Sequence, residues 1–343
     1  MSIIESIGAY TPEKKVLTTD LIGKIKENPP FFLEEVTGIA QRRYREDYEN
    51  SFTMALKAAQ ICLSHSKYEA DDLDLIVYSG ITRFIDGLQF QLDPPFSLML
   101  KNALGASRAI TFDLTNACAG MVTGVHILDN MIRAKAVKRG MVVSGECITH
   151  ITDTALMEIN EVIDQQLASL TVGDAGAAVI IDSSEVVDEG IFYTSMITFA
   201  DYSDLCFAMP SDRTGWPAMY TDSITFHKKA MERGFYTFKA NNILDEFGRL
   251  IDYVIPHQTS IRAITQAFDS FRNHFNIPDG APPYIMINIK DYGNTASTSH
   301  FLLLYQKIKS GEIVPGSTCL LASPASGIVI GYIVVTLGAL NNF

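Results

Sequence analysis

The chain has 343 residues, 47% of them hydrophobic and 19% charged, and a formal net charge of −12. This balance indicates a well-buried globular protein, and the acidic excess argues against a general nucleic-acid binder, which needs a basic face. The opening segment MSIIESIGAYTPEKK lacks the features of a signal peptide, and no apolar run reaches the roughly 20 residues that span a bilayer. The five cysteines are dispersed without a CxxC pair, so we expect a cytoplasmic protein with free thiols, no metal and no cofactor.

Short apolar runs alternate with longer stretches of helical periodicity, which is typical of an α/β protein. In the first half the pattern predicts helices over residues 51–66 and 119–137, a loop over 89–95, and strands over 74–81, 109–114, 140–146 and 176–182. In the second half it predicts helices over 223–247, 259–275 and 295–309, and strands over 191–200, 252–257, 283–289, 318–322 and 327–335.

No low-complexity linker separates two independent domains. The acidic stretch that begins at Asp182 is the best boundary between a first half, residues 1–182, and a second half, residues 183–343. In each half an apolar strand leads to a polar residue, at Cys118 and at His257. Because sites in open α/β sheets gather beyond the carboxyl ends of strands, both residues are candidates for chemistry.

Cys118 follows a predicted strand and precedes a predicted helix, with Ala119 and Gly120 next to it. A cysteine at a helix N-terminus is favoured as the thiolate, and its small neighbours leave room for a substrate. A buried structural cysteine remains the alternative. The other four cysteines lie in helical or strand patterns or in loops without such a setting, and we interpret them as structural.

His257 ends a predicted strand directly after Pro256, a setting suited to an acid, a base or a hydrogen-bond donor, although a structural histidine remains possible. Asn294 follows Gly293 before a predicted helix, where it is either a cap or an amide donor to a developing enolate. Glu146 is either an auxiliary base or a strand-end surface carboxylate.

The motifs DLTNACAGM, IPHQTS and YGNTAS, in this order, resemble the three active-site motifs of β-ketoacyl-acyl-carrier-protein synthase III, a condensing enzyme of the thiolase superfamily. The resemblance extends to TGIAQRRY (37–44), VGDAGAAV (172–179) and SGIVIG (326–331). It implies a thiolase fold of five αβαβα layers built from two similar halves, and a homodimer. It also implies that Cys118 is the acylated nucleophile, that His257 and Asn294 bind the second thioester, and that the backbone N–H groups of Cys118 and Ser326 form the oxyanion hole.

Four further residues match the family's entrance for carrier protein and pantetheine: Lys239, Arg262, Phe32 and Gln166. Lys239 and Arg262 match positions that help to dock the acidic carrier. Phe32, Val36 and Gln166 replace the tryptophan and the two arginines with which the family grips the adenine of coenzyme A, and the loss of such contacts should weaken adenine binding by about 1–2 kcal/mol each.

The resemblance therefore implies an acyltransferase that forms a carbon–carbon bond by Claisen condensation, in specialised lipid or polyketide assembly of the resorcinol or pyrone type. Its expected partners are acyl carrier protein, acyl-CoA substrates, or both, with no nucleic acid and no membrane. Three alternatives remain: transfer of the Cys118 acyl group to oxygen or nitrogen, housekeeping initiation of fatty-acid synthesis, and an inactive partner subunit. Phe84, Phe90, Phe96, Met99 and Met209 are expected to shape the acyl tunnel.

Overall fold

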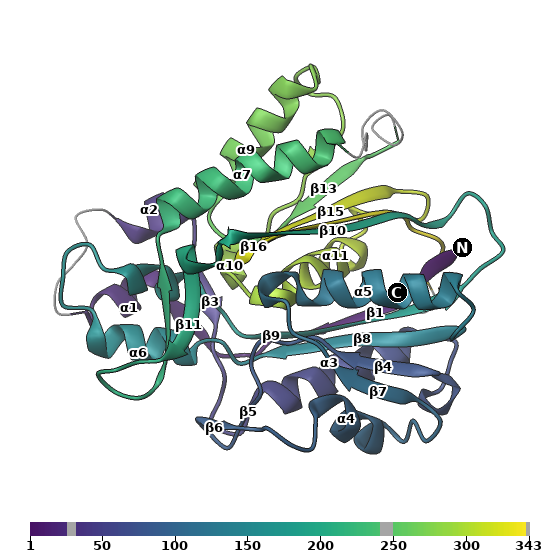
Figure 1. Ribbon diagram of the computed structural model, residues 1–343, viewed down its shortest axis with the longest axis horizontal. Coiled ribbons are helices and arrows are strands. Elements are labelled where there is room, and N and C mark those ends of the chain that lie inside the picture. Colours follow the sequence, from purple (N-terminus) through teal and green to yellow (C-terminus); the bar gives the residue numbers. More distant parts are fainter. Residues whose placement is uncertain (26–31, 241–249, 341–343) are drawn as a thin grey trace.

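The computed structural model describes residues 1–25, 32–240 and 250–340. Its described part contains two five-stranded sheets, stacked with helices between them and outside each (Figure 1). The first sheet has the order β1-β9-β8-β4-β7 and contains Ser2–Tyr10, Ala175–Ser183, Arg139–Glu146, Leu75–Tyr78 and Ile110–Asp113. The second has the order β10-β16-β15-β13-β14 and contains Gly190–Tyr202, Gly327–Thr336, Thr318–Ala325, Tyr253–Pro256 and Tyr284–Ile285.

The two sheets share one pairing pattern. Along each order the first two pairs of strands are antiparallel and the last two are parallel. This repetition confirms the expected fold of two similar halves. The strands of the first sheet lie within residues 2–183 and those of the second within 190–336. The division of the chain at residues 182 and 183 remains a proposal.

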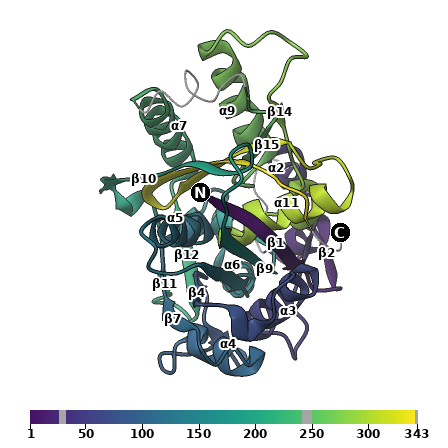
Figure 2. The same cartoon turned by 90° about the vertical axis from the view of Figure 1, so that its right-hand side faces the viewer.

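Three layers of helices complete the five-layered arrangement (Figures 1 and 2). The middle layer contains α5 (Gly120–Arg133) and α11 (Ser299–Lys309), which contact strands of both sheets. The helices α3 (Ser51–His65) and α4 (Phe96–Leu104) cover the outer face of the first sheet, and α7 (Ser223–Ala240) and α9 (Ile261–His274) cover that of the second.

The shorter elements lie around these layers. They are the helices α1 (Thr18–Ile22), α2 (Leu33–Thr37), α6 (His150–Glu158) and α10 (Ile289–Tyr292), and the two-stranded pairs β2 (Lys15–Leu17) with β3 (Gln41–Arg43), β5 (Phe84–Ile85) with β6 (Gln89–Phe90), and β11 (Cys206–Pro210) with β12 (Pro217–Thr221). No helix in the described ranges is both long enough and apolar enough to cross a bilayer.

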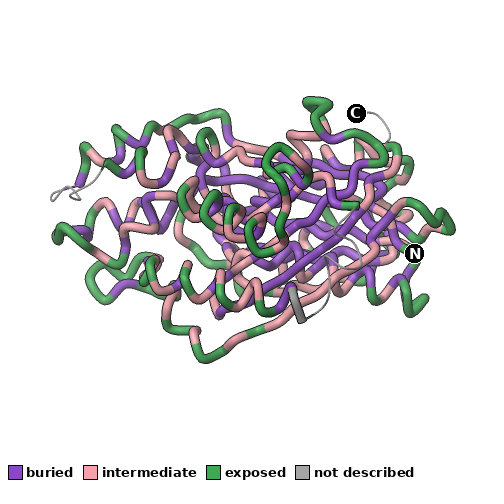
Figure 3. The backbone as a smooth tube through the Cα atoms, turned by 90° about the horizontal axis from the view of Figure 1, so that it is seen from above, coloured by how far each residue is buried: buried purple, intermediate pink, exposed green. Residues whose placement is uncertain are grey.

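The main core lies where the middle helices meet both sheets. It joins Val125 of α5 and Phe301 of α11 to Val179 of β9 and Ile333 of β16. Figure 3 shows the central strands as mostly buried, whereas the outer helices and loops mix buried, intermediate and exposed residues. Strands covered on both faces have nearly continuous apolar sequences, and this is why the runs in β9 and β16 could be identified from the sequence.

Several predicted elements need correction. The expected strand over 283–289 is limited to Tyr284–Ile285, and α10 begins at Ile289. The expected loop over 89–95 begins with the short strand β6. The sequence reading did not identify β1, α4, α6 or the hairpin of β11 and β12, because their apolar patterns are short or mixed. The predicted helix over 223–247 is α7 as far as Ala240, and residues 241–247 lie outside the described part.

Candidate active site

Cys118 lies in a 3₁₀ turn, Ala117–Ala119, between β7 and α5. Ala117 has a φ of 46°, in the left-handed region that residues with a side chain seldom occupy. Gly120 allows α5 to begin against the end of β4, because a Cβ there would lie 2.2 Å from the carbonyl oxygen of Ser79. The sharp turn and this close approach place Cys118 at the junction of the sheet and the middle helices.

The Cys118 side chain is half-buried among apolar groups from both halves of the chain. Ile148, Ile151 and Val172 of the first half pack near it, together with Ala296 and Val329 of the second. Burial raises the pKa of the Cys118 thiol, and Cys206 and Glu146 raise it further. This direction is opposite to the one expected from the helix N-terminus, because removal of water outweighs the effect of the local backbone N–H group.

His257 directly follows β13 and is almost fully buried. Its backbone N–H donates to the carbonyl of Ala322 at 3.0 Å, and its ring stacks on His300 with the ring centroids 5.7 Å apart. Burial lowers the pKa of His257 well below its usual value, and His300 and His227 lower it further. The imidazole is therefore neutral near neutral pH and can donate from one nitrogen only.

The backbone on both sides of Asn294 fixes its position. Gly293 has a φ of 65°, and a Cβ at this residue would lie 2.6 Å from the carbonyl oxygen of Thr171. The Asn294 backbone N–H donates to that same carbonyl at 2.9 Å, and the Asn294 side-chain oxygen accepts from the Ala296 N–H at 2.9 Å. Because the amide oxygen is already bonded, the amide NH₂ is the end left to donate to a substrate.

Glu146 ends β8 but is fully buried, so its interpretation as a surface carboxylate is wrong. Its carboxylate accepts from the backbone N–H groups of Ile81 and Thr82 at 3.0 and 3.1 Å, and from the Thr82 hydroxyl at 3.0 Å. The Ser144 hydroxyl is 3.4 Å away, and the Ser297 hydroxyl also donates to the carboxylate. Burial raises the pKa of Glu146, while these donors oppose the shift.

The fold brings the turns that carry the three predicted catalytic residues to one place. The turn Ala117–Ala119 contacts the turn Ala296–Thr298, which follows Asn294, and also contacts β15 and β16. His257 is hydrogen-bonded to Ala322 of β15. Ser326, whose N–H is predicted to serve the oxyanion hole, lies between β15 and β16 beside this junction. The catalytic roles themselves remain proposals.

The residues predicted for the entrance differ in exposure. Phe32 is 76% exposed directly before α2, and Arg262 is exposed in the first turn of α9. Gln166 is 0% exposed and donates to Glu158 at 2.8 Å, so this conformation does not present it as the wall of an open slot. Lys239 lies in α7, but its side chain is outside the described part of the structure.

Two residues beside the site were missed by the sequence reading. Cys206 of β11 accepts a hydrogen bond from the Ser326 hydroxyl at 3.2 Å and raises the pKa of Cys118. His300 of α11 stacks on His257. The place of His300 could have been suspected, because it lies six residues after Asn294 on the apolar face of a predicted helix. Nothing in the sequence around Cys206 indicates its place beside Ser326, 120 residues away.

The expected acyl tunnel also needs revision. Phe96 is fully buried among Phe52, Tyr78 and Leu100 on the outer side of the first sheet, and Met209 is exposed on β11. The apolar side chains near Cys118 instead include those of Ile81 and Met219.

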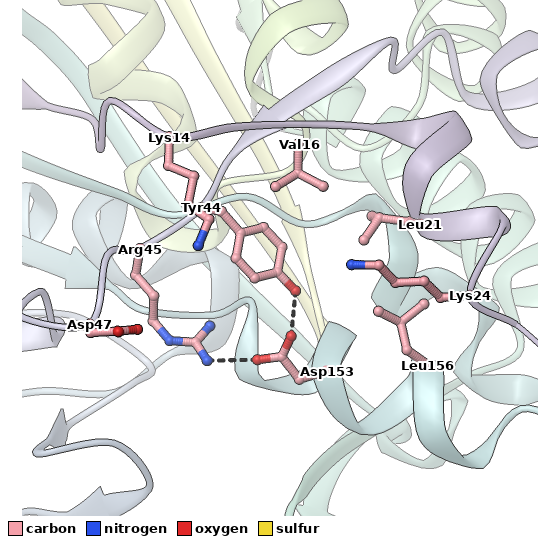
Figure 4. A pocket seen from close by; sticks show the side chains of 9 residues that line it. All are labelled: Lys14, Val16, Leu21, Lys24, Tyr44, Arg45, Asp47, Asp153 and Leu156. Carbon is pink, nitrogen blue, oxygen red and sulfur yellow. Dashed lines mark hydrogen bonds and ion pairs between the residues drawn. The ribbon is translucent and has the colours of Figure 1, made fainter.

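A surface pocket of about 290 Å³ opens between α1 and α6 (Figure 4). Arg45 and Tyr44 each contact the Asp153 carboxylate there at 2.6 Å, and Lys24 also lines the pocket. None of the predicted site residues lines this pocket. Within the described ranges, no group of three or more His, Cys, Asp or Glu side chains is arranged to hold a metal ion.

Comparisons with known proteins agree with this arrangement. A family model described as 3-oxoacyl-[acyl-carrier-protein] synthase III matches residues 112–199, and its C-terminal counterpart matches residues 249–337, together about half of the chain. A β-ketoacyl-[acyl-carrier-protein] synthase III from Granulibacter bethesdensis is 26% identical over 339 residues, which cover 96% of this chain and 97% of that protein.

Two solved structures illustrate the similarity of fold. A variant of OleA from Xanthomonas campestris superposes with a TM-score of 0.82 at 20% identity, covering 98% of both chains. A priming β-ketosynthase from a polyketide biosynthetic pathway superposes with a TM-score of 0.81 at 24% identity, covering 98% of this chain and 96% of the other.

Proposed function

This chain belongs to the β-ketoacyl-acyl-carrier-protein synthase III-like condensing enzymes of the thiolase superfamily, and from this premise we propose that it joins two acyl units through an acyl-Cys118 intermediate. The observation that carries the proposal is the convergence of three turns. The turn of Cys118 meets the turn after Asn294 and the end of β15, to which His257 is bonded. The first half thus contributes the proposed nucleophile and the second half the two proposed donors, all from neighbouring segments.

In the first half-reaction, the Cys118 sulfur bonds to the carbonyl carbon of an acyl thioester. The bond from that carbon to the donor's sulfur breaks, and the Cys118 proton passes to the departing thiol. The backbone N–H groups of Cys118 and Ser326 stabilise the oxyanion that forms in between. Loss of one such donor typically raises the barrier by about 3 kcal/mol. The Ile148, Ile151 and Met219 side chains near Cys118 favour an apolar acyl group.

In the second half-reaction, His257 and Asn294 donate to the carbonyl oxygen of a carboxylated extender thioester. Loss of CO₂ leaves a carbanion, which bonds to the acyl carbon while the bond to Cys118 breaks. The Cys118 sulfur then takes up a proton from water. The Asn294 NH₂ suits this role because the Asn294 amide oxygen already accepts a hydrogen bond from the Ala296 N–H. We assign Glu146 to holding the Ser297 turn rather than to proton abstraction, because its carboxylate already accepts several hydrogen bonds.

Carrier-bound substrates and specialised lipid or polyketide assembly fit this site better than acetyl-CoA priming. Tight adenine binding in the family relies on an aromatic ring and a guanidinium as opposite walls. Here Phe32 supplies an exposed ring, but Gln166 has no charge and is buried against Glu158. The protein thus lacks a stacking slot for the adenine of acyl-CoA, whereas a carrier protein can be bound by Lys239 of α7 and Arg262 of α9.

The test separates the two half-reactions. The protein is incubated with a panel of acyl-CoA and acyl-carrier thioesters, and peptide mapping locates the added mass. We expect the adduct on Cys118, with the other four cysteines as internal controls. His257→Ala and Asn294→Ala should still acylate at Cys118 but lose condensation, by about 10²–10³-fold for each donor removed. An adduct that persists in Cys118→Ala, or equal loss of both steps in both donor variants, would contradict these assignments.

A further inference from the structure

His300 lies beside the proposed catalytic histidine and has no assigned role. Its ring is fully buried in α11, and its Nε2 donates to the Ala322 carbonyl at 2.9 Å. The same carbonyl accepts the backbone N–H of His257 at 3.0 Å. The rings of His257 and His300 stack with an interplanar angle of 23°. The two histidines therefore share the Ala322 carbonyl as a hydrogen-bond acceptor, and their rings are in stacking contact.

The hydrogen bond to Ala322 fixes the protonation of His300. A carbonyl oxygen only accepts, so Nε2 of His300 must carry its hydrogen. Burial lowers the pKa of His300 to about 4, so the ring is neutral near neutral pH and its Nδ1 carries no hydrogen. That Nδ1 is buried without a partner in the described part of the chain. His300 therefore keeps one tautomer and presents an uncharged ring to His257.

His257, like His300, has a buried Nδ1 without a hydrogen-bond partner among the described residues. A buried N–H without an acceptor is rarer in proteins than a buried acceptor without a donor, so the hydrogen of neutral His257 belongs on Nε2. Because Nδ1 is buried, we assign Nε2 as the nitrogen that faces a substrate. This tautomer is the one that donates to a thioester carbonyl.

The only other titratable group that acts on His257 within the described residues is His227 of α7. Its Nδ1 lies 2.6 Å from the Ser223 carbonyl, and its Nε2 is buried without a described partner. A positive charge on either His300 or His227 opposes a positive charge on His257, and no carboxylate of the described residues compensates it. The surroundings therefore favour a neutral His257.

We propose that His300 is a positioning residue for His257, holding its imidazole by ring stacking and by their shared Ala322 carbonyl so that Nε2–H points to the second substrate. The proposal rests on the function proposed above and adds a residue to its second half-reaction. A purely packing role could be filled by phenylalanine. Positioning requires the hydrogen bond as well as the ring.

Three variants separate these roles. His300→Phe keeps a ring but removes the donor, whereas His300→Gln keeps an N–H that can reach the Ala322 carbonyl. His65→Phe is the matched control, because His65 also stacks on an aromatic ring, Tyr305 at 6.0 Å, and its Nδ1 lies 3.0 Å from a backbone carbonyl in another layer. For each protein, single-turnover acylation of Cys118, condensation, and the ¹⁵N signals of His257 over pH are measured, and thermal unfolding shows that the fold is intact.

We expect His300→Phe to load Cys118 at the wild-type rate and to condense roughly tenfold to a hundredfold more slowly, the loss typical of a misplaced group. The His257 pKa should rise, because an opposing titratable ring is removed, and the Nε2–H tautomer should lose population. His300→Gln should recover part of the condensation rate, and His65→Phe should match the wild type. Unchanged His257 signals, or equal loss of loading and condensation, would overturn the proposal.

The experiment also separates this proposal from the proposed function. If the wild-type protein condenses no pair of thioesters, the function fails, but the His257 signals still test His300. A changed His257 tautomer in a folded His300→Phe protein then supports positioning, and an unchanged tautomer refutes it. Should His300→Phe unfold, His300→Gln tests the ring instead, because it removes the stacking and keeps the hydrogen bond. A changed His257 tautomer in this variant supports positioning, and an unchanged one refutes it.

Discussion

Burial raises the pKa of the Cys118 thiol, so the sulfur of this proposed nucleophile is mainly protonated near neutral pH. Below its pKa, the thiolate fraction of a cysteine increases about tenfold for each pH unit. We therefore expect the rate of Cys118 alkylation by iodoacetamide to keep rising through about pH 9, beyond the point near pH 8.5 at which a free cysteine begins to level off.

The measurement follows the mass of the Cys118 peptide over time at each pH, with a small cysteine-containing peptide as the reference in the same tube. A rate that becomes constant below about pH 8 would mean that the helix N-terminus dominates over burial.

Single residues differ in how far their roles could be predicted from the sequence. Cys118 and Asn294 were identifiable because small residues or glycine adjoin them at turns, and these neighbours are part of the local geometry. The burial of Glu146 could not be predicted from the sequence, because its hydrogen-bond donor Ser297 lies 151 residues away. The same holds for His257, whose ring environment depends on His300 in another element. Contacts between distant segments have no local pattern.

Among the elements, the loop that joins β11 to β12 is bonded to Glu158, the last residue of α6. The Glu158 carboxylate accepts from the hydroxyls of Ser211 and Thr214 at 2.6 and 2.7 Å and from the Gln166 amide at 2.8 Å. Arg213 donates to the Glu158 carbonyl at 2.6 Å. Burial alone would raise the pKa of Glu158, but these donors hold it below its usual value.

Replacing Glu158 by alanine removes the acceptor of three hydrogen bonds. Hydrogen bonds to a charged group contribute about 1.5–3 kcal/mol each, and some of the freed donors will bind water, so we expect a loss of about 2–4 kcal/mol in the free energy of unfolding. Amide hydrogen exchange over residues 206–221 should become faster than in the rest of the protein. Glu161→Ala, at an exposed position three residues along, is the control. Equal exchange in both variants would show that the hairpin does not depend on Glu158.

The same interaction should weaken in acid. Because the folded-state pKa of Glu158 is lowered, its contribution to stability is present above the ordinary glutamate value of 4.5 and is lost as pH falls through the folded-state value. The contact between Glu158 and the hairpin could not be predicted from the sequence. The strands of the hairpin are only five residues long, and its partner is a helix that ends about 50 residues earlier.

At the scale of the whole molecule, a net charge of −12 repels any acidic carrier protein. General repulsion must be overcome by local cations, and Lys239 and Arg262 lie on the adjacent outer helices α7 and α9. Contacts between surface charges mainly increase the encounter rate and are screened by salt. We therefore expect a carrier-bound acyl group to load faster than the same acyl group on coenzyme A, with an advantage that shrinks as salt rises.

Charge reversal tests this directly. Lys239→Glu and Arg262→Glu should slow loading from the carrier but leave loading from a short carrier-free thioester nearly unchanged. Lys138→Glu makes the same change of charge at an exposed position after α5 and serves as the control. Equal loading from both donors at low salt, together with no effect of either reversal, would refute carrier docking at these helices.

The overall architecture was predictable only in part. Alternating apolar and helical patterns predicted an α/β protein and most strands of both sheets. The stacking of two sheets around shared middle helices came from the resemblance, because periodicity indicates which face of an element is buried but not which element covers it. The edge position of β7 and the first-sheet pairing of β1 with β9 likewise depend on contacts across the whole half.

The hydrogen bond from Ser297 to Glu146 has a consequence for how the chain reaches its native state. The carboxylate belongs to the first half and this donor to the second, so the contact forms only when the halves dock in the correct register. A collapsed intermediate docked differently would bury an acidic group that lacks one of its donors, and such groups are costly. The contact beside the Asn294 turn therefore also disfavours misassembled chains, so correct docking of the halves depends on residues of the proposed active site.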